Sequence, residues 1–239
     1  MKRIGIIGLC LMAVVAASAV SAASSSAALP EFKSANGFPV TFISSSLLPL
    51  LPTLKSQILG KEENIVCKTA SDKGEISNAT TVAKIKVTYT ECKEESAPTK
   101  MCTTTGKATG TIETEAISGK IGYVGSAAEL VNKLVGIELK PTGLVFIIFT
   151  CTGKAEKVTV EGCTVGVATP TNVSTTLGFL AFEEIGGTNA KSQRFKGFAD
   201  SGTGCTLNTH AGFFELGEGP SWLMDVEMET FTSPIEIKA

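Results

Sequence analysis

The residues with the clearest chemical potential in this 239-residue chain are its cysteines. Six of the seven lie beyond residue 22, and these are Cys67, Cys92, Cys102, Cys151, Cys163 and Cys205. Zinc sites use cysteines separated by two to four residues, often completed by histidine, and redox-active pairs use a C-x-x-C motif. No two cysteines here are that close, and His210 is the only histidine. The spacing argues against a metal or redox site and favours a disulfide framework.

Six cysteines allow 15 sets of pairings, and the sequence alone does not select one. The pairs that we expect are Cys92–Cys102, Cys67–Cys151 and Cys163–Cys205. For the first pair, a strand ends at Cys92 and Pro98 helps the chain to turn back. The two cysteines of the second pair both lie inside apolar strands. The third pair follows by elimination.

One short segment, Asp200-Ser201-Gly202, is similar to the surroundings of the nucleophile in trypsin-like proteases. That mechanism needs a histidine base upstream of the serine and a separate buried aspartate. His210 lies downstream, and the chain has no G-x-S-x-G, H-E-x-x-H, P-loop or EF-hand motif. We therefore interpret the segment as a glycine-rich turn held by a disulfide, and His210 as a surface residue.

Carboxylates could support glycosidase chemistry, which needs two of them at a defined separation. The chain is rich in glutamates, among them Glu94, Glu95, Glu183, Glu184, Glu227 and Glu229. We expect most of them at solvated positions of strands and loops. Beyond residue 22 only Asp72, Asp200 and Asp225 are aspartates, which argues against a calcium cage. The sequence thus predicts no catalytic residue, no metal ligand and no cofactor site.

Three aromatic residues form one candidate contact patch. Phe213 and Phe214 lie in an apparent loop before Trp222, and apolar residues of this kind can bind a partner. Sugar-binding platforms usually present Trp and Tyr, but the chain has one Trp and two Tyr. Core packing explains the three aromatic residues better than binding does, so the patch is a hypothesis.

The secondary-structure signals are many short strands separated by turns. The clearest strand is Thr81 to Cys92, in which Ala83, Ile85, Val87 and Tyr89 would share one face. A capping box at Ser126-Ala-Ala-Glu129, followed by LVNKLVG, predicts one short helix. Strands at Val135 to Lys140 and Gly143 to Cys151 flank Pro141-Thr-Gly and predict a hairpin. The pattern predicts an all-β fold, an antiparallel β-sandwich or barrel-like domain with one short helix and disulfides.

The first 22 residues are typical of a secretory signal peptide. Lys2 and Arg3 precede an apolar stretch, and Val20-Ser21-Ala22 offers small residues for cleavage. Ala17-Ser18-Ala19 is a second candidate cut, and a retained anchor is the alternative to cleavage.

The domain organisation that follows is a signal peptide over residues 1–22, a disordered leader over residues 23–30 and a single β-rich domain over residues 31–239. No later segment has the length and apolarity of a membrane span. We expect a secreted or cell-surface protein without a transmembrane anchor after cleavage.

The charge composition argues against one class of binding partner, nucleic acids. The formal net charge is −2, and loss of Lys2 and Arg3 would make the chain more acidic. Arg3 and Arg194 are the only arginines among 21 basic residues. Nucleic-acid sites depend heavily on arginine, so a nucleic-acid partner is not expected.

Several phrases of the chain, in order, carry a resemblance to a known group of proteins. They are "LPEFKSANG…VTF", "IVCK…GEIS", "VTYTEC", "MCTTTG", "GKIGYVG", "GIELKPTG" and "FTCTG…V". This order resembles an uncharacterised family of exported, disulfide-containing, Thr/Gly-rich β proteins of high-GC Gram-positive bacteria. The resemblance covers most of residues 29–170 and fades after about residue 185. It implies export and a β-rich fold, and it implies no activity because the family has none assigned.

The sequence favours a non-enzymatic function over an enzymatic one. We expect an exported cell-surface or extracellular binding or structural module. Its ligand is unknown, a cell-wall or extracellular ligand is one candidate, and we expect no cofactor. The alternative is a secreted, glycosidase-like hydrolase with two inward carboxylates about 5–10 Å apart. A third hypothesis is a lipid or small-ligand carrier, which a large apolar cavity would reveal.

Overall fold

The structure is a computed structural model that describes residues 28–58, 61–124, 134–154, 156–182, 193–197, 204–211 and 218–239. Every regular element in these residues is a β-strand. The predicted helix is not found there: Leu134, Val135 and Gly136 begin a strand, and residues 125–133 lie outside the described residues. The all-β prediction is confirmed, and the helix prediction is not.

Eight antiparallel strands form a closed barrel, which we call the main barrel. In spatial order they are β2 (Val40–Ser46), β5 (Thr69–Asn78), β6 (Thr81–Ile85), β11 (Ile117–Val124), β12 (Leu134–Pro141), β15 (Thr164–Thr169), β16 (Ser174–Phe182) and β20 (Glu218–Lys238). β20 pairs with β16 on one side and β2 on the other, and this closes the ring. Of the two predicted architectures, the structure is therefore a barrel and not a sandwich.

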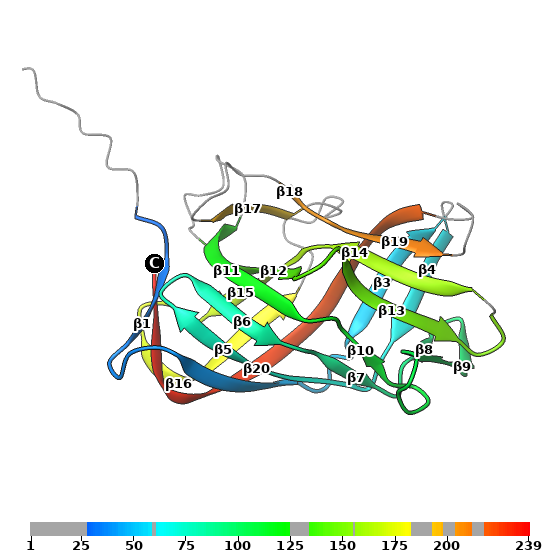
Figure 1. Ribbon diagram of the computed structural model, residues 1–239, viewed down its shortest axis with the longest axis horizontal. Helices are drawn as coiled ribbons and strands as arrows, with labels where there is room; N and C mark the ends of the chain where they lie inside the picture. The colour runs from blue at the N-terminus through cyan, green and yellow to red at the C-terminus, as the bar shows by residue number, and fades with distance from the viewer. Residues whose placement is uncertain are drawn as a thin grey trace, which may run out of the picture.

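A second set of strands also pairs in a ring, which we call the second ring. It contains β3 (Thr53–Ile58), β4 (Lys61–Val66), β8 (Lys93–Glu94), β9 (Ala97–Thr103), β13 (Val145–Cys151), β14 (Lys157–Gly162), β19 (Leu207–Ala211) and the first part of β20. Figure 1 shows the main barrel on the left and the second ring on the right, with β20 running through both. The long strand β20 thus joins the two halves.

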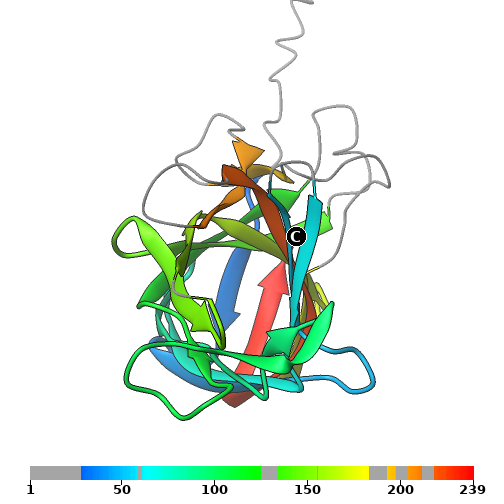
Figure 2. The same cartoon turned by 90° about the vertical axis from the view of Figure 1, so that its right-hand side faces the viewer.

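The five remaining strands are additions to these rings. They are β1 (Glu31–Ser34), β7 (Thr88–Thr90), β10 (Ile112–Glu113), β17 (Gln193–Gly197) and β18 (Gly204–Cys205). β1 pairs with the end of β20, and β7 pairs with both β5 and β10. In the end-on view of Figure 2 the strands surround one interior, and most buried apolar residues of both halves form a single continuous core.

Two local predictions need correction. The predicted strand from Thr81 to Cys92 is interrupted at residues 86–87, between β6 and β7; Ile85, Val87 and Tyr89 are buried as expected, but Val82 replaces Ala83 on the buried face, next to Lys84 with its positive φ of 58°. The predicted hairpin does not form: β12 pairs with β11 and β15, whereas β13 pairs with β14 and β9. The turn at Pro141 therefore connects the main barrel to the second ring.

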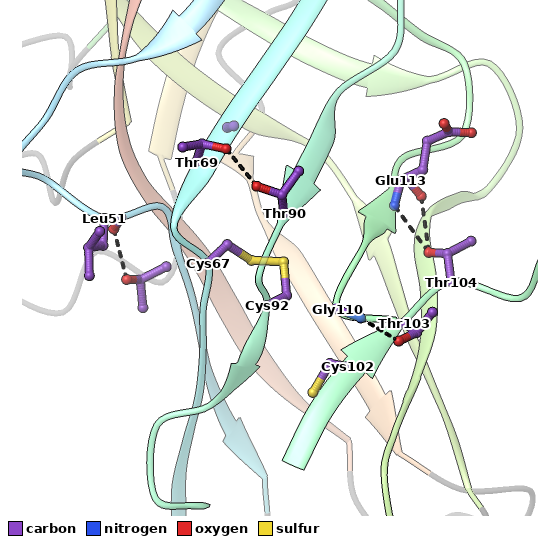
Figure 3. Close-up of a disulfide and its surroundings, with 12 residues drawn as sticks. Leu51, Cys67, Thr69, Thr90, Cys92, Cys102, Thr103, Thr104, Gly110 and Glu113 are labelled. Carbon is purple, nitrogen blue, oxygen red and sulfur yellow. Dashed lines mark hydrogen bonds between the residues drawn. A yellow bond between two sulfur atoms is a disulfide. The ribbon is translucent and has the colours of Figure 1, made fainter. Parts of the chain in front are cut away.

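Three disulfides are present, and they are Cys67–Cys92, Cys102–Cys151 and Cys163–Cys205. The third pair was predicted, and the first two predicted pairs are wrong. Strand register explains the difference, because pairing of Thr69 with Thr90 brings their neighbouring cysteines together (Figure 3). Cys102 lies directly opposite Cys151 across β9 and β13. Three disulfides indicate an oxidising environment.

The start of the described chain lies against the main barrel. The Tyr123 hydroxyl donates a hydrogen bond to the carbonyl oxygen of Ala28 at 3.1 Å, Leu29 packs against the core, and Pro30 is buried. The predicted signal peptide, residues 1–22, lies outside the described residues. Within the described part of the chain, no helix has the length and apolarity to cross a membrane.

Candidate functional site

The most unusual feature of the structure is the orientation of β20. Along a strand, alternate side chains point to opposite faces. In β20 the buried face carries Asp225, Glu227 and Glu229 in succession, and the outer face carries Val226 and Met228. The usual arrangement of a half-exposed strand, with apolar residues inside and charged residues outside, is inverted here.

The neighbouring strands β2 and β5 add serines and one more acid to these residues. We call Asp72, Asp225, Glu227 and Glu229 the acidic row. Ser44 on β2 lies directly opposite Glu229 on one side and Asp72 of β5 on the other. One row along, Ser46 lies opposite Glu227 and accepts a hydrogen bond from the amide of Ala70 at 2.9 Å. Three adjacent strands therefore present serines and carboxyl groups to the interior in register.

A cavity of about 50 Å³ lies inside the main barrel beside this row. Asp72, Glu227 and Glu229 are its acidic lining residues, and the rest of the wall is mainly apolar and aromatic. Tyr89 also contributes to the lining. A space of this size holds a few water-sized groups, because one water needs roughly 10–15 Å³ on this scale.

The acidic row has unmet bonding capacity. Of the described residues, no lysine, arginine or histidine forms an ion pair with Asp72, Asp225, Glu227 or Glu229. The Oε2 atom of Glu229, on a side chain that is only 9% exposed, has no hydrogen-bond partner. The buried Ser44 hydroxyl lies next to Asp72, Glu227 and Glu229, but it makes no hydrogen bond of standard geometry.

Burial keeps protons on the two aspartates at higher pH than usual. Loss of hydration raises the pKa of Asp72 from 3.8 to about 6, and the nearby Ser44 hydroxyl opposes that rise. Loss of hydration also raises the pKa of Asp225 to about 7; the amide of Val226 lowers it, and the negative charge of Asp72 adds to the rise. Both groups therefore titrate close to neutral pH rather than near pH 4.

The two glutamates are affected more strongly. Burial, followed by the negative charges of Asp72 and other acids of the row, raises the pKa of Glu227 well above 4.5. Burial and the charge of Asp72 likewise raise the pKa of Glu229. Burial and the charges of Glu227 and Asp225 also raise the pKa of Tyr89. Burial thus favours the protonated form of both glutamates, and a protonated carboxyl group can donate as well as accept hydrogen bonds.

The arrangement is not a preassembled metal cage. Only one group of three potential ligand residues in the described ranges has its ligand atoms within 4.8 Å of one another, namely Glu138, Cys163 and Cys205. The two sulfurs are bonded to each other, so neither offers a thiolate to a metal. The acidic row is wider than such a cage, and a cation entering it would meet carboxyl groups from β5 and β20 and serine hydroxyls from β2.

Of the sequence-derived candidates, the carboxylates Asp72, Asp225, Glu227 and Glu229 lie in this site, whereas the described residues Trp222 and His210 do not. Trp222 is a half-buried residue on the outer face of β20, opposite Lys55. His210 lies on β19, with Nε2 3.8 Å from a carboxylate oxygen of Glu161. Phe213, Phe214, Asp200 and Ser201 lie outside the described residues. Only Trp222 of the predicted apolar patch belongs to the described residues, so the patch stays a hypothesis.

The prediction that most glutamates are solvated is wrong for three of those named. Glu227 and Glu229 face the barrel interior, and Glu94 is buried beside Lys154, with 2.8 Å between its Oε1 and Nζ. Alternation in WLMDVEME identifies the strand but not which face is inside. The pairing of β20 with the charge-free segments VTFISSS and STTLGFLAF, which the sequence does not reveal, distinguishes the two faces.

Comparisons with known proteins add no relative. No protein-family model, no curated protein and no solved structure matches the chain. The functional argument therefore depends on the geometry and chemistry of the chain itself.

Proposed function

We propose that this chain is an exported, non-enzymatic binding protein whose barrel takes up a small cation in its acidic cavity. The observation that carries this proposal is the inward row of Asp72, Glu227 and Glu229 around a cavity, with no basic side chain paired to it in the described residues. Burying a carboxylate without a partner is costly, and either a proton or a cation offsets that cost. A cation would supply the partner that the fold does not.

The size of the cavity limits the ligand. About 50 Å³ accommodates a metal ion with a few waters, or an ammonium or methylammonium group. Pockets for drug-sized molecules measure about 300–1,000 Å³, so a lipid or an oligosaccharide does not fit this interior. This argues against the carrier hypothesis as well as against a glycosidase that would bind its substrate here.

Protons and cations compete for the same carboxylates, so the proposal predicts that cation affinity depends on pH. A cation binds ionised carboxylates, so affinity should rise as the acids lose their protons. With the pKa of Asp72 at about 6 and that of Asp225 at about 7, binding should be weak at pH 5 and stronger at pH 8.

The test is calorimetric titration of the oxidised protein at pH 5 and pH 8 with Ca²⁺, Mg²⁺, Na⁺, K⁺, ammonium and methylammonium. We expect saturable binding of at least one cation at pH 8 and its loss in the double variant Glu227→Gln with Glu229→Gln. The matched control is Glu156→Gln, since Glu156 is exposed. Absence of binding by every cation at pH 8 would contradict the proposal.

A secreted, glycosidase-like hydrolase is the alternative that the sequence left open, and the size of the cavity argues against substrate binding beside the inward acids. Activity on a panel of chromogenic glycosides, abolished by Glu227→Gln or Glu229→Gln, would favour it over a binding protein. Export rests on the leader and on the three disulfides. Its test is the mass and N-terminal sequence of the protein recovered from the medium of a secreting host.

A further inference from the structure

The outer surface opposite the acidic row is an unusually apolar sheet face. On β16, β20 and β2 the outward residues align in register: Leu177 lies opposite Thr230, which lies opposite Ile43. In the next row Phe179 lies opposite Met228, which lies opposite Ser45. We call these three strands, together with the leucines of the loop that follows β2, the neutral face.

The large apolar side chains of the neutral face are exposed. Ile43 is 63% exposed, Leu177 is 47% exposed and Phe179 is 37% exposed. The loop continues this surface with Leu47, Leu48, Leu50 and Leu51, each at least 40% exposed. Together they expose on the order of 600 Å², the upper end of what the largest apolar patch on a monomer usually reaches.

The centre of the neutral face carries no charge. β2 (VTFISSS), the loop (LLPLLP) and β16 (STTLGFLAF) contain no ionisable side chain, and the nearest charges lie at its edges: Lys73 of β5 opposite Ile43, and Glu236 of β20 opposite Ser174. The three acids in the adjoining part of β20 all point into the barrel. Depletion of charge at the centre of a patch, with a polar rim, is the compositional mark of a protein–protein interface.

We propose that the neutral face binds the same face of a second copy of this chain and forms a two-fold symmetric dimer. A charge-free face meets its own copy without electrostatic repulsion, and a two-fold axis brings identical patches together. The main barrel is closed, so these strands have no free edge for strand addition, and the remaining route is sheet-to-sheet packing.

Other partners fit this face less well. An anionic membrane surface or a nucleic acid would require a cluster of basic side chains; β2, the loop and β16 supply none, and Lys73 lies at the edge of the face. A standard interface buries about 800 Å² on each partner, and the apolar residues with their serine and threonine neighbours approach that area. A groove of about 490 Å³ adjoins the face, lined in part by Leu50, Leu51, Met224 and Val226, and it can receive a protruding side chain such as Leu48.

The test is sedimentation velocity of the oxidised protein over about a hundredfold range of concentration. We expect a reversible monomer–dimer equilibrium in wild type, and monomer at every concentration in Ile43→Lys and in Leu177→Lys. The matched control is Leu144→Lys, because Leu144 is 81% exposed and lies outside the neutral face. Circular dichroism verifies that each variant retains the wild-type fold.

A mixing experiment distinguishes a specific dimer from non-specific association through exposed apolar residues. Ile43→Lys and Ile43→Glu should each be monomeric alone and should form a heterodimer when mixed, because the two faces then carry opposite charges. A monomeric wild type, a Leu144→Lys variant that loses the dimer, or co-sedimentation of the monomer with neutral phosphatidylcholine vesicles would overturn the proposal. Cation binding in the cavity is independent of each of these outcomes.

Discussion

Glu229 lies directly opposite Ser44 across the β2–β20 pairing, and both side chains are buried on the inner face of the main barrel. Neither the Glu229 Oε2 atom nor the Ser44 hydroxyl has a hydrogen-bond partner of standard geometry. A carboxyl group in this setting has lost the hydration that stabilises its ionised form, so its pKa is raised. The predictions about pH follow from this relationship.

Stability should fall as pH rises from about 4 to about 7. Asp72 and Asp225, with raised pKa values of about 6 and about 7, keep protons in the folded state that the unfolded chain releases above about pH 4. Each such group lowers the free energy of unfolding by about 1.4 kcal/mol per pH unit within its window. Below pH 4 both states are protonated and the effect ends. Urea unfolding at pH 4 to 8 measures it.

The pKa of Glu113 is shifted downward, so Glu113 affects the free energy of unfolding at acid pH and with the opposite sign. Its pKa is lowered by hydrogen bonds with Lys107 and Lys86, so it contributes stability above about pH 4.5 that is lost below its folded-state pKa. Protonation of Glu113 therefore lowers the free energy of unfolding at the acid end of the pH range. A stability that increased steadily from pH 4 to pH 8 would contradict protonation of the buried acids.

Replacing a buried glutamate by glutamine should stabilise the protein at pH 8. Glu227→Gln and Glu229→Gln keep the shape of the side chain and remove the charge that burial disfavours, so each should gain about 1–3 kcal/mol at pH 8. At pH 4 the gain should vanish, because the wild-type acids are then protonated. Glu156→Gln is the control and should change stability little at either pH, since Glu156 is exposed.

The disulfide pairing can be read from tryptic peptides of the unreduced protein. Lys93 and Lys100 separate Cys92 from Cys102, so the pairs Cys67–Cys92 and Cys92–Cys102 give different linked peptides. We expect linked peptides for the first of these and for Cys102–Cys151. The intact mass should be lower by six hydrogens than that of the reduced chain. Linked peptides that contain both Cys92 and Cys102 would refute the pairing.

The disulfides should also contribute strongly to stability. Cys67–Cys92 closes a loop with a sequence separation of 25 residues, and Cys102–Cys151 closes one of 49. By loop entropy each is worth about 3.5–4 kcal/mol. Replacing both cysteines of one pair by alanine should therefore lower the melting temperature clearly, and adding reductant to that variant should lower it further.

Gly162 should not tolerate a side chain. Its φ is +102°, and a Cβ there would overlap the carbonyl oxygen of Thr206, next to the Cys163–Cys205 bond. Gly162→Ala should cost at least about 1–3 kcal/mol in the free energy of unfolding. Gly143→Ala is the matched control, since nothing lies within 4 Å of a Cβ at that position, and its effect should be small. Equal melting temperatures for the two variants would contradict this account of the turn.

The sequence predicted the all-β fold because alternation and turn residues are local signals. Which strands pair is a non-local property, and this is why the Cys67 and Cys102 pairings and the β12–β13 hairpin were predicted wrongly. Cys163–Cys205 was reached by elimination and is confirmed.

The acidic row was not predicted from the sequence, and the reason differs from that for the wrong strand pairings. Alternation in β20 gives two faces but does not state which one is inside, and the ordinary expectation places acids in solvent. Asp72 and Asp225 are 153 positions apart in the chain, so only the closed barrel brings their charges near each other. A sequence-based prediction needed the β5–β2–β20 register, and no local pattern provides it.

The most direct test of the inward acidic row is a carbon-13 NMR titration of the side-chain carboxyl groups of Glu227 and Glu229, with Glu156 as the exposed reference. The structure predicts that both buried groups titrate well above pH 4.5, shifted by burial and by the charge of Asp72. Midpoints near 4.5 for Glu227 and Glu229, equal to that of an ordinary exposed glutamate, would mean that β20 faces the other way.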